Sequence, residues 1–171
     1  MNKIFLLFII LLNTGLAFAE KSESLPQGMQ NPGYHEKPAW CKESFLDIRE
    51  DIEEASSNGK RVLLYFYQDG CPYCGKLLQD NFGNREIANY SQANFDVIAI
   101  NLWGDKEVVD VEGNNATEKE FSKKLRVQFT PTLVFMNEQG EVLLRINGYF
   151  APYKFMTVLR YIAEKKEDSI A

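Results

Sequence analysis

The stretch that decides the fold runs from residue 65 to residue 74 and reads Tyr65-Phe66-Tyr67-Gln68-Asp69-Gly70-Cys71-Pro72-Tyr73-Cys74. It ends an apolar and aromatic run that begins at Val62, which is typical of a central strand covered on both faces. The Asp69-Gly70 pair breaks that strand. Pro72 then suits the first position of a helix, where its missing N–H would have no partner anyway. The sequence therefore places Cys71 where a buried strand turns into a helix.

The spacing of Cys71 and Cys74 predicts different chemical roles for the two thiols. The amides and the dipole at the start of the helix favour the thiolate of Cys71, because thiols in such positions typically have pKa values of roughly 3.5–7.5. Cys74 lies one turn further along the same helix face. It can attack a mixed disulfide formed at Cys71 and release the substrate. We therefore expect Cys71 to be the nucleophile and Cys74 the resolving thiol.

Two other uses of a Cys-x-x-Cys pair remain open alternatives. In a zinc site, Cys41 and His35, the single histidine, would complete a Cys₃His set. Against zinc, His35 falls in an irregular segment and the chain has no second Cys-x-x-Cys. A static structural disulfide is the stronger alternative if the chain is exported.

The segments around this stretch predict a mixed α/β order. Helices are expected from Lys42 to about Asn58, from Pro72 to about Asn81, at 85–92, at 118–125 and from Pro152 onward; strands are expected at 62–67, 95–102, 132–136 and 141–146. This order predicts a parallel pair of strands followed by an antiparallel hairpin, with helices on both faces. The irregular segment 103–117 has a possible hairpin turn at Gly113-Asn114.

The residues after the second strand are expected to border the cysteine pair. The carboxyl ends of parallel strands meet at one edge of a sheet, where ligand sites of α/β folds gather. Trp103, Gly104 and Asp105 follow the strand predicted at 95–102. We expect these three residues at the active site and the rest of the segment as partner surface or as a decorative hairpin.

The N-terminal residues predict export. Lys3, an apolar run at 4–12 and Ala17-Phe18-Ala19 form the pattern of a secretory signal peptide over residues 1–19. The apolar run is much shorter than the ~20 residues that span a membrane. Residues 20–41 are predicted to be a flexible lead-in, and 42–171 a single domain. The protein would be periplasmic if its host is a Gram-negative bacterium.

Composition excludes two classes of partner. The chain carries 19 Lys and Arg residues against 24 Asp and Glu residues, and its sequence has no run of basic residues. A mildly acidic chain of this kind lacks the positive charge that nucleic acids and anionic membranes require. Cys41, beside Trp40, is expected to be a buried or half-buried free thiol.

From about Lys42 to Ala163 the chain resembles the thioredoxin superfamily. The strand–Cys-x-x-Cys–helix stretch carries the resemblance, together with Phe129-Thr130-Pro131-Thr132-Leu133, which is similar to the family's cis-proline segment, and Gly140-Glu141-Val142 with Gly148, which are similar to its closing hairpin. Trp103-Gly104-Asp105 makes the chain most similar to exported thioredoxins of the sulfur-oxidation type.

The resemblance implies a thioredoxin fold and a protein disulfide reductase that needs no cofactor or metal. It implies a cis bond before Pro131, with the backbone of Thr130 pairing with substrate strands, and substrate contacts at Tyr73 and Trp103. The resemblance also implies that the substrates are disulfides in other proteins and that the protein is a monomer. Because the compartment is oxidising, we expect a membrane thiol–disulfide electron donor to keep the protein reduced.

The chain departs from the family at the residues behind the cysteines. The buried carboxylate of thioredoxins, six residues before the first cysteine, is replaced by Tyr65, and a core lysine by Ala99. Cys-Pro-Tyr-Cys is also the glutaredoxin motif, so a glutathione-dependent glutaredoxin is one alternative, although Gly148-Tyr149-Phe150 replaces the expected two-glycine glutathione site. A Cu(I)-binding chaperone is the other.

Overall fold

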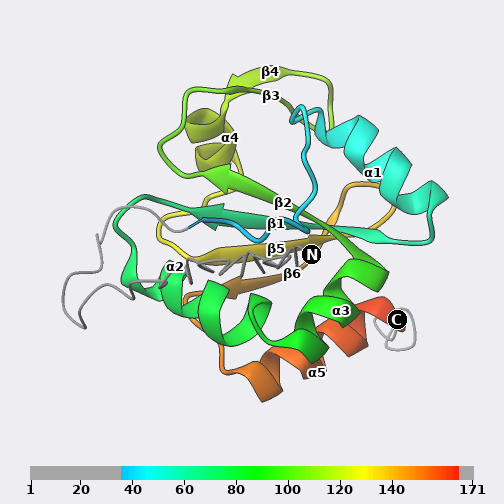
Figure 1. Ribbon diagram of the computed structural model, residues 1–171. Helices are drawn as coiled ribbons and strands as arrows, with labels where there is room; N and C mark the ends of the chain where they lie inside the picture. The colour runs from blue at the N-terminus through cyan, green and yellow to red at the C-terminus, as the bar shows by residue number, and fades with distance from the viewer. Residues whose placement is uncertain (1–35, 166–171) are drawn as a thin grey trace, which may run out of the picture. The chain divides into compact units, whose positions relative to one another are not determined.

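A computed structural model of the chain describes residues 36–165. The predicted signal peptide, His35 and most of the predicted lead-in lie outside this range. The described residues form a four-stranded sheet with helices on both faces and a separate two-stranded hairpin (Figure 1). This arrangement is the thioredoxin fold that the sequence predicts.

The elements follow the predicted order. They are α1 (Ile48–Ser57), β1 (Arg61–Tyr67), α2 (Pro72–Leu77), the π-helical turn η1 (Leu78–Phe82), α3 (Arg85–Asn94), β2 (Phe95–Asn101), β3 (Glu107–Val109), β4 (Asn115–Thr117), α4 (Glu118–Lys124), β5 (Thr132–Met136), β6 (Val142–Asn147) and α5 (Pro152–Ala163). The hairpin expected within 103–117 is formed by β3 and β4.

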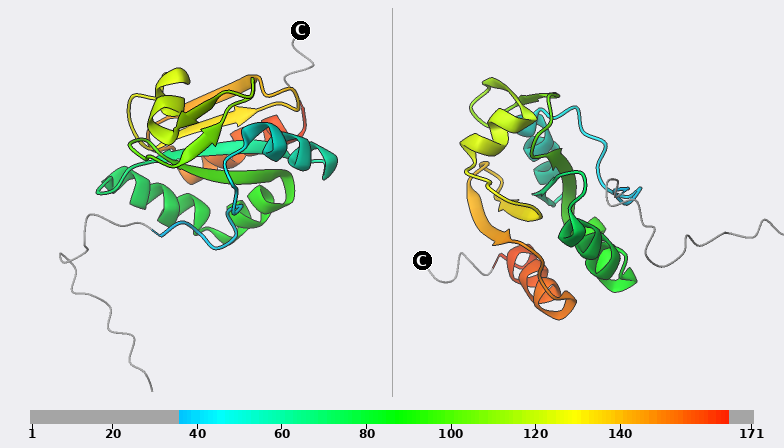
Figure 2. Two further views of the ribbon diagram at one scale, coloured as in Figure 1. Left: turned by 90° about the horizontal axis from the view of Figure 1, so that it is seen from above. Right: turned by 90° about the vertical axis from the view of Figure 1, so that its left-hand side faces the viewer.

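The sheet has the strand order β2-β1-β5-β6. β1 and β2 are parallel, whereas β5 is antiparallel to both β1 and β6. Helices α1 and α4 cover one face, and α2, α3 and α5 cover the other (Figures 1 and 2). The carboxyl ends of β1 and β2 therefore lie at one edge, where Leu102 donates its N–H to the carbonyl oxygen of Tyr67 over 2.7 Å.

The core consists of two apolar clusters, one on each face of the sheet. Alternate residues of β1 enter different clusters: Leu64 and Phe66 pack beneath α1 and α4, and Leu63 and Tyr65 pack towards α2, α3 and α5. A strand buried on both faces needs apolar residues at every position. Burial on both faces is therefore the physical cause of the unbroken apolar run of β1.

The first helix begins later than the sequence predicts. The predicted helix start at Lys42 is wrong, because α1 begins at Ile48. Phe45 fits the helical spacing of Ile48 and Ile52, but it is fully exposed. The carboxylate of Asp47 accepts the N–H groups of Arg49 and Glu50, which caps the helix at that point. Leu46 has a left-handed backbone with φ of 65°, which interrupts any helix from Lys42.

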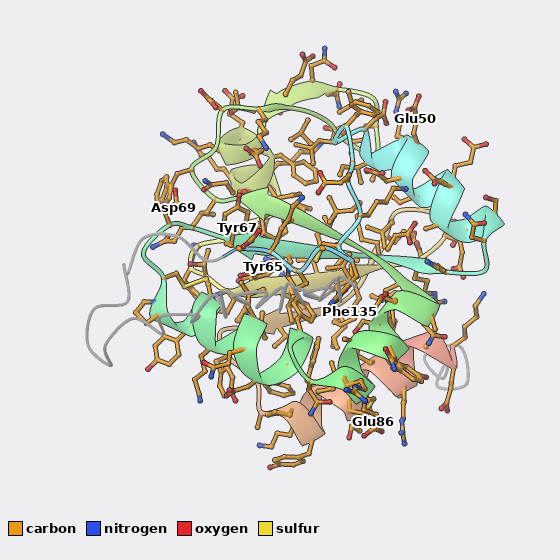
Figure 3. All side chains as sticks on the ribbon, viewed as in Figure 1. Glu50, Tyr65, Tyr67, Asp69, Glu86 and Phe135 are labelled. Carbon is orange, nitrogen blue, oxygen red and sulfur yellow. A yellow bond between two sulfur atoms is a disulfide. The ribbon has the colours of Figure 1, made fainter. Side chains whose placement is uncertain are left out.

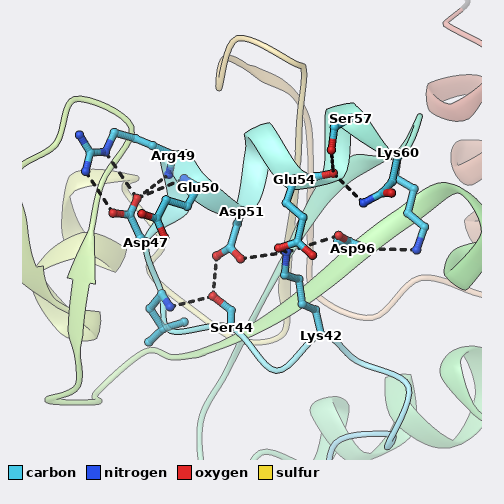
Figure 4. Close-up of polar contacts among 12 residues, drawn as sticks. Lys42, Ser44, Asp47, Arg49, Glu50, Asp51, Glu54, Ser57, Lys60 and Asp96 are labelled. Atoms are coloured by element: carbon cyan, nitrogen blue, oxygen red, sulfur yellow. Dashed lines mark hydrogen bonds and ion pairs between the residues drawn. The ribbon is translucent and has the colours of Figure 1, made fainter.

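Part of the predicted flexible lead-in packs against the domain. Cys41 is only 3% exposed, and the backbone N–H of Lys42 donates to Val97 of β2. The ammonium group of Lys42 lies 3.2 Å from Asp51 and 2.7 Å from Glu54, so it also fastens this segment to α1 (Figure 4). Cys41 and Lys42 are therefore held against β2 and α1. These contacts join residues far apart in sequence, which a local pattern does not reveal.

Candidate active site

Cys71 and Cys74 lie where the chain leaves β1 and enters α2. Cys71 is the N-cap of α2, and Pro72 is its first helical residue, as the sequence predicts. The two cysteines form a disulfide with a Cα–Cα distance of 5.2 Å. The backbone N–H of Cys74 donates to Cys71 Sγ over 3.1 Å. A donor in this position stabilises negative charge on the Cys71 sulfur once the disulfide is opened.

The Thr130–Pro131 peptide bond is cis and faces the cysteine pair, as expected. The carbonyl oxygen of Thr130 lies 3.5 Å from Cys71 Sγ. Thr132 donates its hydroxyl to the carbonyl oxygen of Phe129, and Gly148 donates its N–H to that of Pro131. These bonds hold the segment from both sides. An edge of polypeptide backbone is therefore held beside the disulfide.

Three exposed aromatic side chains come from the segments around the disulfide. Tyr73, Trp103 and Phe129 are 62%, 63% and 51% exposed. The indole N–H of Trp103 donates to the side-chain oxygen of Gln68, in the turn before Cys71, over 3.1 Å. This bond places Trp103 beside the turn that leads to Cys71, and its role in substrate contact stays a prediction. Phe129, which the sequence marks only as part of the cis-proline segment, is a further candidate for substrate contact because its side chain is exposed.

The position of the family's buried acid is occupied by an uncharged side chain. Tyr65 is 1% exposed, and its ring stacks on Tyr67 with centroids 5.8 Å apart (Figure 3). Burial raises the pKa of Tyr65 above its ordinary value. Ala99 is its neighbour on β2. The buried side of this site therefore has neither the carboxylate nor the lysine of thioredoxins at these two positions.

A polar group on α2 and η1 ties these elements to the loop after β6. The carboxylate of Asp80 accepts hydrogen bonds from the ammonium of Lys76 and from the hydroxyl of Tyr149, each over 2.7 Å. These bonds lower the pKa of the Asp80 carboxyl group. Lys76 also lies 4.9 Å from the centre of the Tyr149 ring. The sequence does not reveal this group, because Tyr149 is 69 residues from Asp80.

Cys41 is a buried free thiol, which confirms the prediction made from its neighbour Trp40. Burial raises its pKa to about 11. At neutral pH the thiol is protonated and is a poor nucleophile.

Within residues 36–165, no three His, Cys, Asp or Glu side chains gather as a metal ion would require. Over the same residues, no helix is both long and apolar enough to cross a membrane.

The family model for the thioredoxin-like domain matches residues 48–163. The chain belongs to this family. It is 30% identical over 115 residues to the thiol:disulfide interchange protein DsbD of Vibrio cholerae, a match that covers 66% of this chain and 18% of that protein. The chain thus spans about a fifth of the length of this relative.

Solved structures are similar over most of the domain. A thioredoxin-fold protein from Helicobacter pylori is 26% identical, with a TM-score of 0.56, over 73% of this chain and 84% of that one. A thioredoxin from Thermus thermophilus is 25% identical, with a TM-score of 0.54, over 68% and 83% of the two chains.

Proposed function

We propose that this chain is an exported thiol–disulfide oxidoreductase that reduces disulfides in other proteins. The observation that carries the proposal is the Cys71–Cys74 disulfide at the start of α2, beside the cis Thr130–Pro131 bond. The similarity of the chain to a thiol:disulfide interchange protein supports the same chemistry.

The reaction transfers two electrons from the cysteine pair to the substrate. In the reduced protein, the thiolate of Cys71 attacks one sulfur of the substrate disulfide, and the other substrate sulfur leaves as a thiolate. The thiolate of Cys74 then attacks Cys71 in the mixed disulfide. The substrate is released with both sulfurs reduced, and the Cys71–Cys74 disulfide forms. The N–H of Cys74 supports the thiolate at Cys71, and the Thr130 backbone offers hydrogen bonds to a substrate strand.

The cycle requires a source of electrons. After each turnover the disulfide must be reduced again, and an exported protein has no access to cytosolic reductants. A membrane thiol–disulfide electron donor meets this need. The predicted signal peptide at 1–19 is the feature that supports export, and we propose that the protein acts as a monomer.

Trapping of mixed disulfides tests the assigned roles. In the Cys74→Ser variant, Cys71 can attack a substrate but cannot be released, so substrate proteins should accumulate as adducts that dithiothreitol dissolves. The Cys71→Ser variant is the matched control and should trap few or none. Stronger trapping by Cys71→Ser would show that Cys74 is the nucleophile and Cys71 the resolving thiol. No adducts with either variant, and no reduction of a model disulfide by the unmodified protein, would refute the proposed function.

A further inference from the structure

A groove with a cationic wall lies beside the proposed active site. It has a volume of about 400 Å³, and its lining combines apolar with positively charged side chains: Leu102, Trp103, Lys119, Lys123, Arg126, Val127 and Gln128. No acidic side chain lines it. The chain as a whole carries a net charge of −5, so this surface differs in sign from the molecule around it.

The three cations, Lys119, Lys123 and Arg126, form a stripe along α4 and just beyond its end. Lys119 and Lys123 are four residues apart on α4 and share a face, and Arg126 lies three positions further on, just after the helix. Within residues 36–165 none of the three lies within ion-pair distance of a carboxylate, and the Lys119 ammonium lies 5.7 Å from the centre of the Trp103 ring. The neighbouring Lys124, in contrast, is neutralised by Asp110 and Glu112.

Glu120 is the acid that acts on this stripe: Thr117 and, more weakly, Lys119 and Lys123 lower the pKa of its carboxyl group, but within residues 36–165 it forms no ion pair with them. The carboxylate of Glu120 is held by the backbone N–H and hydroxyl of Thr117, as a cap of α4. Asp105 is exposed and does not line the groove. Like charges spaced four residues apart destabilise a helix slightly. Lys123 lies in the last turn of α4, where the helix dipole favours a cation, but Lys119 lies in the first turn, where the dipole opposes one, so the fold does not account for the whole stripe.

The backbone conformation at Arg126 also indicates that the fold does not account for the cation at this position. Arg126 has a φ of 55°, in the left-handed region where helices most often place glycine. Its carbonyl oxygen accepts a hydrogen bond from Arg145. A long cationic side chain thus stands at a position where glycine would fit the backbone better.

The groove reaches the redox site at two points. At one, the Trp103 indole bonds to Gln68, three residues before Cys71. At the other, Gln128 leads through Phe129 to Thr130, whose carbonyl oxygen lies 3.5 Å from Cys71 Sγ. A polypeptide whose disulfide sits at Cys71 can therefore extend into the groove.

We propose that this groove selects protein substrates with acidic residues next to their reactive disulfide, with carboxylates facing the three cations and an apolar side chain against Trp103 and Val127. The inference rests on the proposed function, since it names the class of substrate for the same site. Attraction between opposite charges mainly accelerates association and is weakened by salt.

Two synthetic peptides test this preference. Each contains one intramolecular disulfide, with Glu residues beside the cysteines in one peptide and Gln residues in the other. The measured quantity is the ratio of their second-order rate constants with the reduced protein. At low ionic strength the Glu peptide should react about tenfold faster. The ratio should fall towards one in several hundred millimolar salt.

Variants of the stripe locate the effect. The ratio should fall towards one in Lys119→Gln/Lys123→Gln, and it should fall in Arg126→Gly, which suits the left-handed backbone and is expected to fold. The matched control Arg85→Gln/Lys154→Gln removes the same charge from exposed residues outside the groove and should keep the ratio.

The outcomes separate the two proposals. A ratio of one in the unmodified protein, a ratio that survives in both groove variants, or an equal loss in the control would overturn the groove as the site of selection, while reduction of the Gln peptide would still support the proposed function. Reduction of neither peptide would overturn the proposed function, and this inference with it.

Discussion

Cys41 differs from the other two cysteines by its surroundings rather than by its chemistry. Its exposure of 3% is close to the 5% of Cys71, but Cys71 Sγ has the N–H of Cys74 as a donor, whereas burial raises the pKa of Cys41 to about 11 from an ordinary 9.0. We expect an alkylating agent at pH 6 to 7 to label Cys71 first in the reduced native protein and to reach Cys41 only after unfolding. Peptide mapping of the labelled sites measures the order. Labelling of Cys41 at the rate of Cys71 would contradict its assignment as an inert core residue.

The same thiol makes a pH-dependent contribution to stability. Its folded pKa lies above its unfolded pKa, so the fold favours the protonated form. The contribution is therefore complete below about pH 9 and is lost as the pH rises towards 11. Denaturant unfolding between pH 8 and 11 should show a steeper loss for the native chain than for Cys41→Ala. Equal slopes would show that the thiol does not titrate differently on folding.

Tyr65 carries a buried hydroxyl group that has no hydrogen-bond partner among residues 36–165. An unpaired buried hydroxyl costs about 1–3 kcal/mol. Tyr65→Phe removes that hydroxyl and keeps the stacked ring, so we expect the free energy of unfolding to rise by about 1 kcal/mol. Urea denaturation of both proteins measures the difference. A clear loss of stability would instead reveal a partner for the hydroxyl, such as a buried water molecule.

At the scale of elements, the β3–β4 hairpin is a structural part of the domain. Val108 is fully buried, and Val109 donates its N–H to Leu46 beside the start of α1. Deleting residues 108–115 would therefore remove part of the core, so a deletion cannot test the hairpin as partner surface. The turn at Trp103 is the part of the 103–117 segment that reaches the candidate active site.

Asp110 organises the loop between these two strands. Its carboxylate is 2% exposed and accepts the N–H groups of Glu112 and Asn114 and the ammonium of Lys124. Burial by itself would raise the pKa of Asp110, but these donors outweigh it and hold the pKa well below 3.8. The stability that the ionised group contributes is therefore present above about pH 4 and is lost as the pH falls below it.

Asp110→Asn should weaken the hairpin, because the amide cannot pair with Lys124. We expect a loss of about 1–2 kcal/mol at pH 7, and a smaller difference from the native chain as the pH falls towards 3. Thermal unfolding across this range provides the measurement. Lys106→Gln, an exposed substitution just before the hairpin, is the control. A difference that grows at low pH would contradict the sign of the argument.

At the scale of the whole molecule, the expected reduction potential is intermediate. Pro72 offers no amide to the Cys71 thiolate, and Tyr73 offers no cation, so the site lacks the groups of a strong oxidant. Replacement of the buried acid by Tyr65 removes one source of repulsion from that thiolate and moves the potential upward. The nearest guide is the glutaredoxin range of about −200 to −230 mV. Equilibration with glutathione buffers measures it, and a value near about −120 mV would make the protein a disulfide donor instead of a reductant.

Much of the fold could be predicted from local patterns. The apolar run of β1, the Asp69-Gly70 break and Pro72 predict the junction at Cys71, and the structure places it there. The parallel pairing of β1 and β2 follows from element order, and it brings Trp103 to the site. The start of α1 was predicted wrongly, because an apolar residue such as Phe45 matches helical spacing whether or not the chain buries it. The finer resemblance to sulfur-oxidation thioredoxins stays an expectation.

The sequence by itself determined the order of the elements and the pairing of Cys71 with Cys74, because both depend on neighbours a few residues away. Only the tertiary structure decided which distant groups meet. It joins Tyr149 to Asp80, packs Cys41 and Lys42 against β2, and sets the unpaired cations of α4 beside Trp103. Along the chain Lys119 stands between Glu118 and Glu120, and Lys123 and Arg126 are too few to predict a basic surface by themselves. Folding neutralises Lys124 and leaves Lys119, Lys123 and Arg126 together, because pairing of charges depends on distance in space.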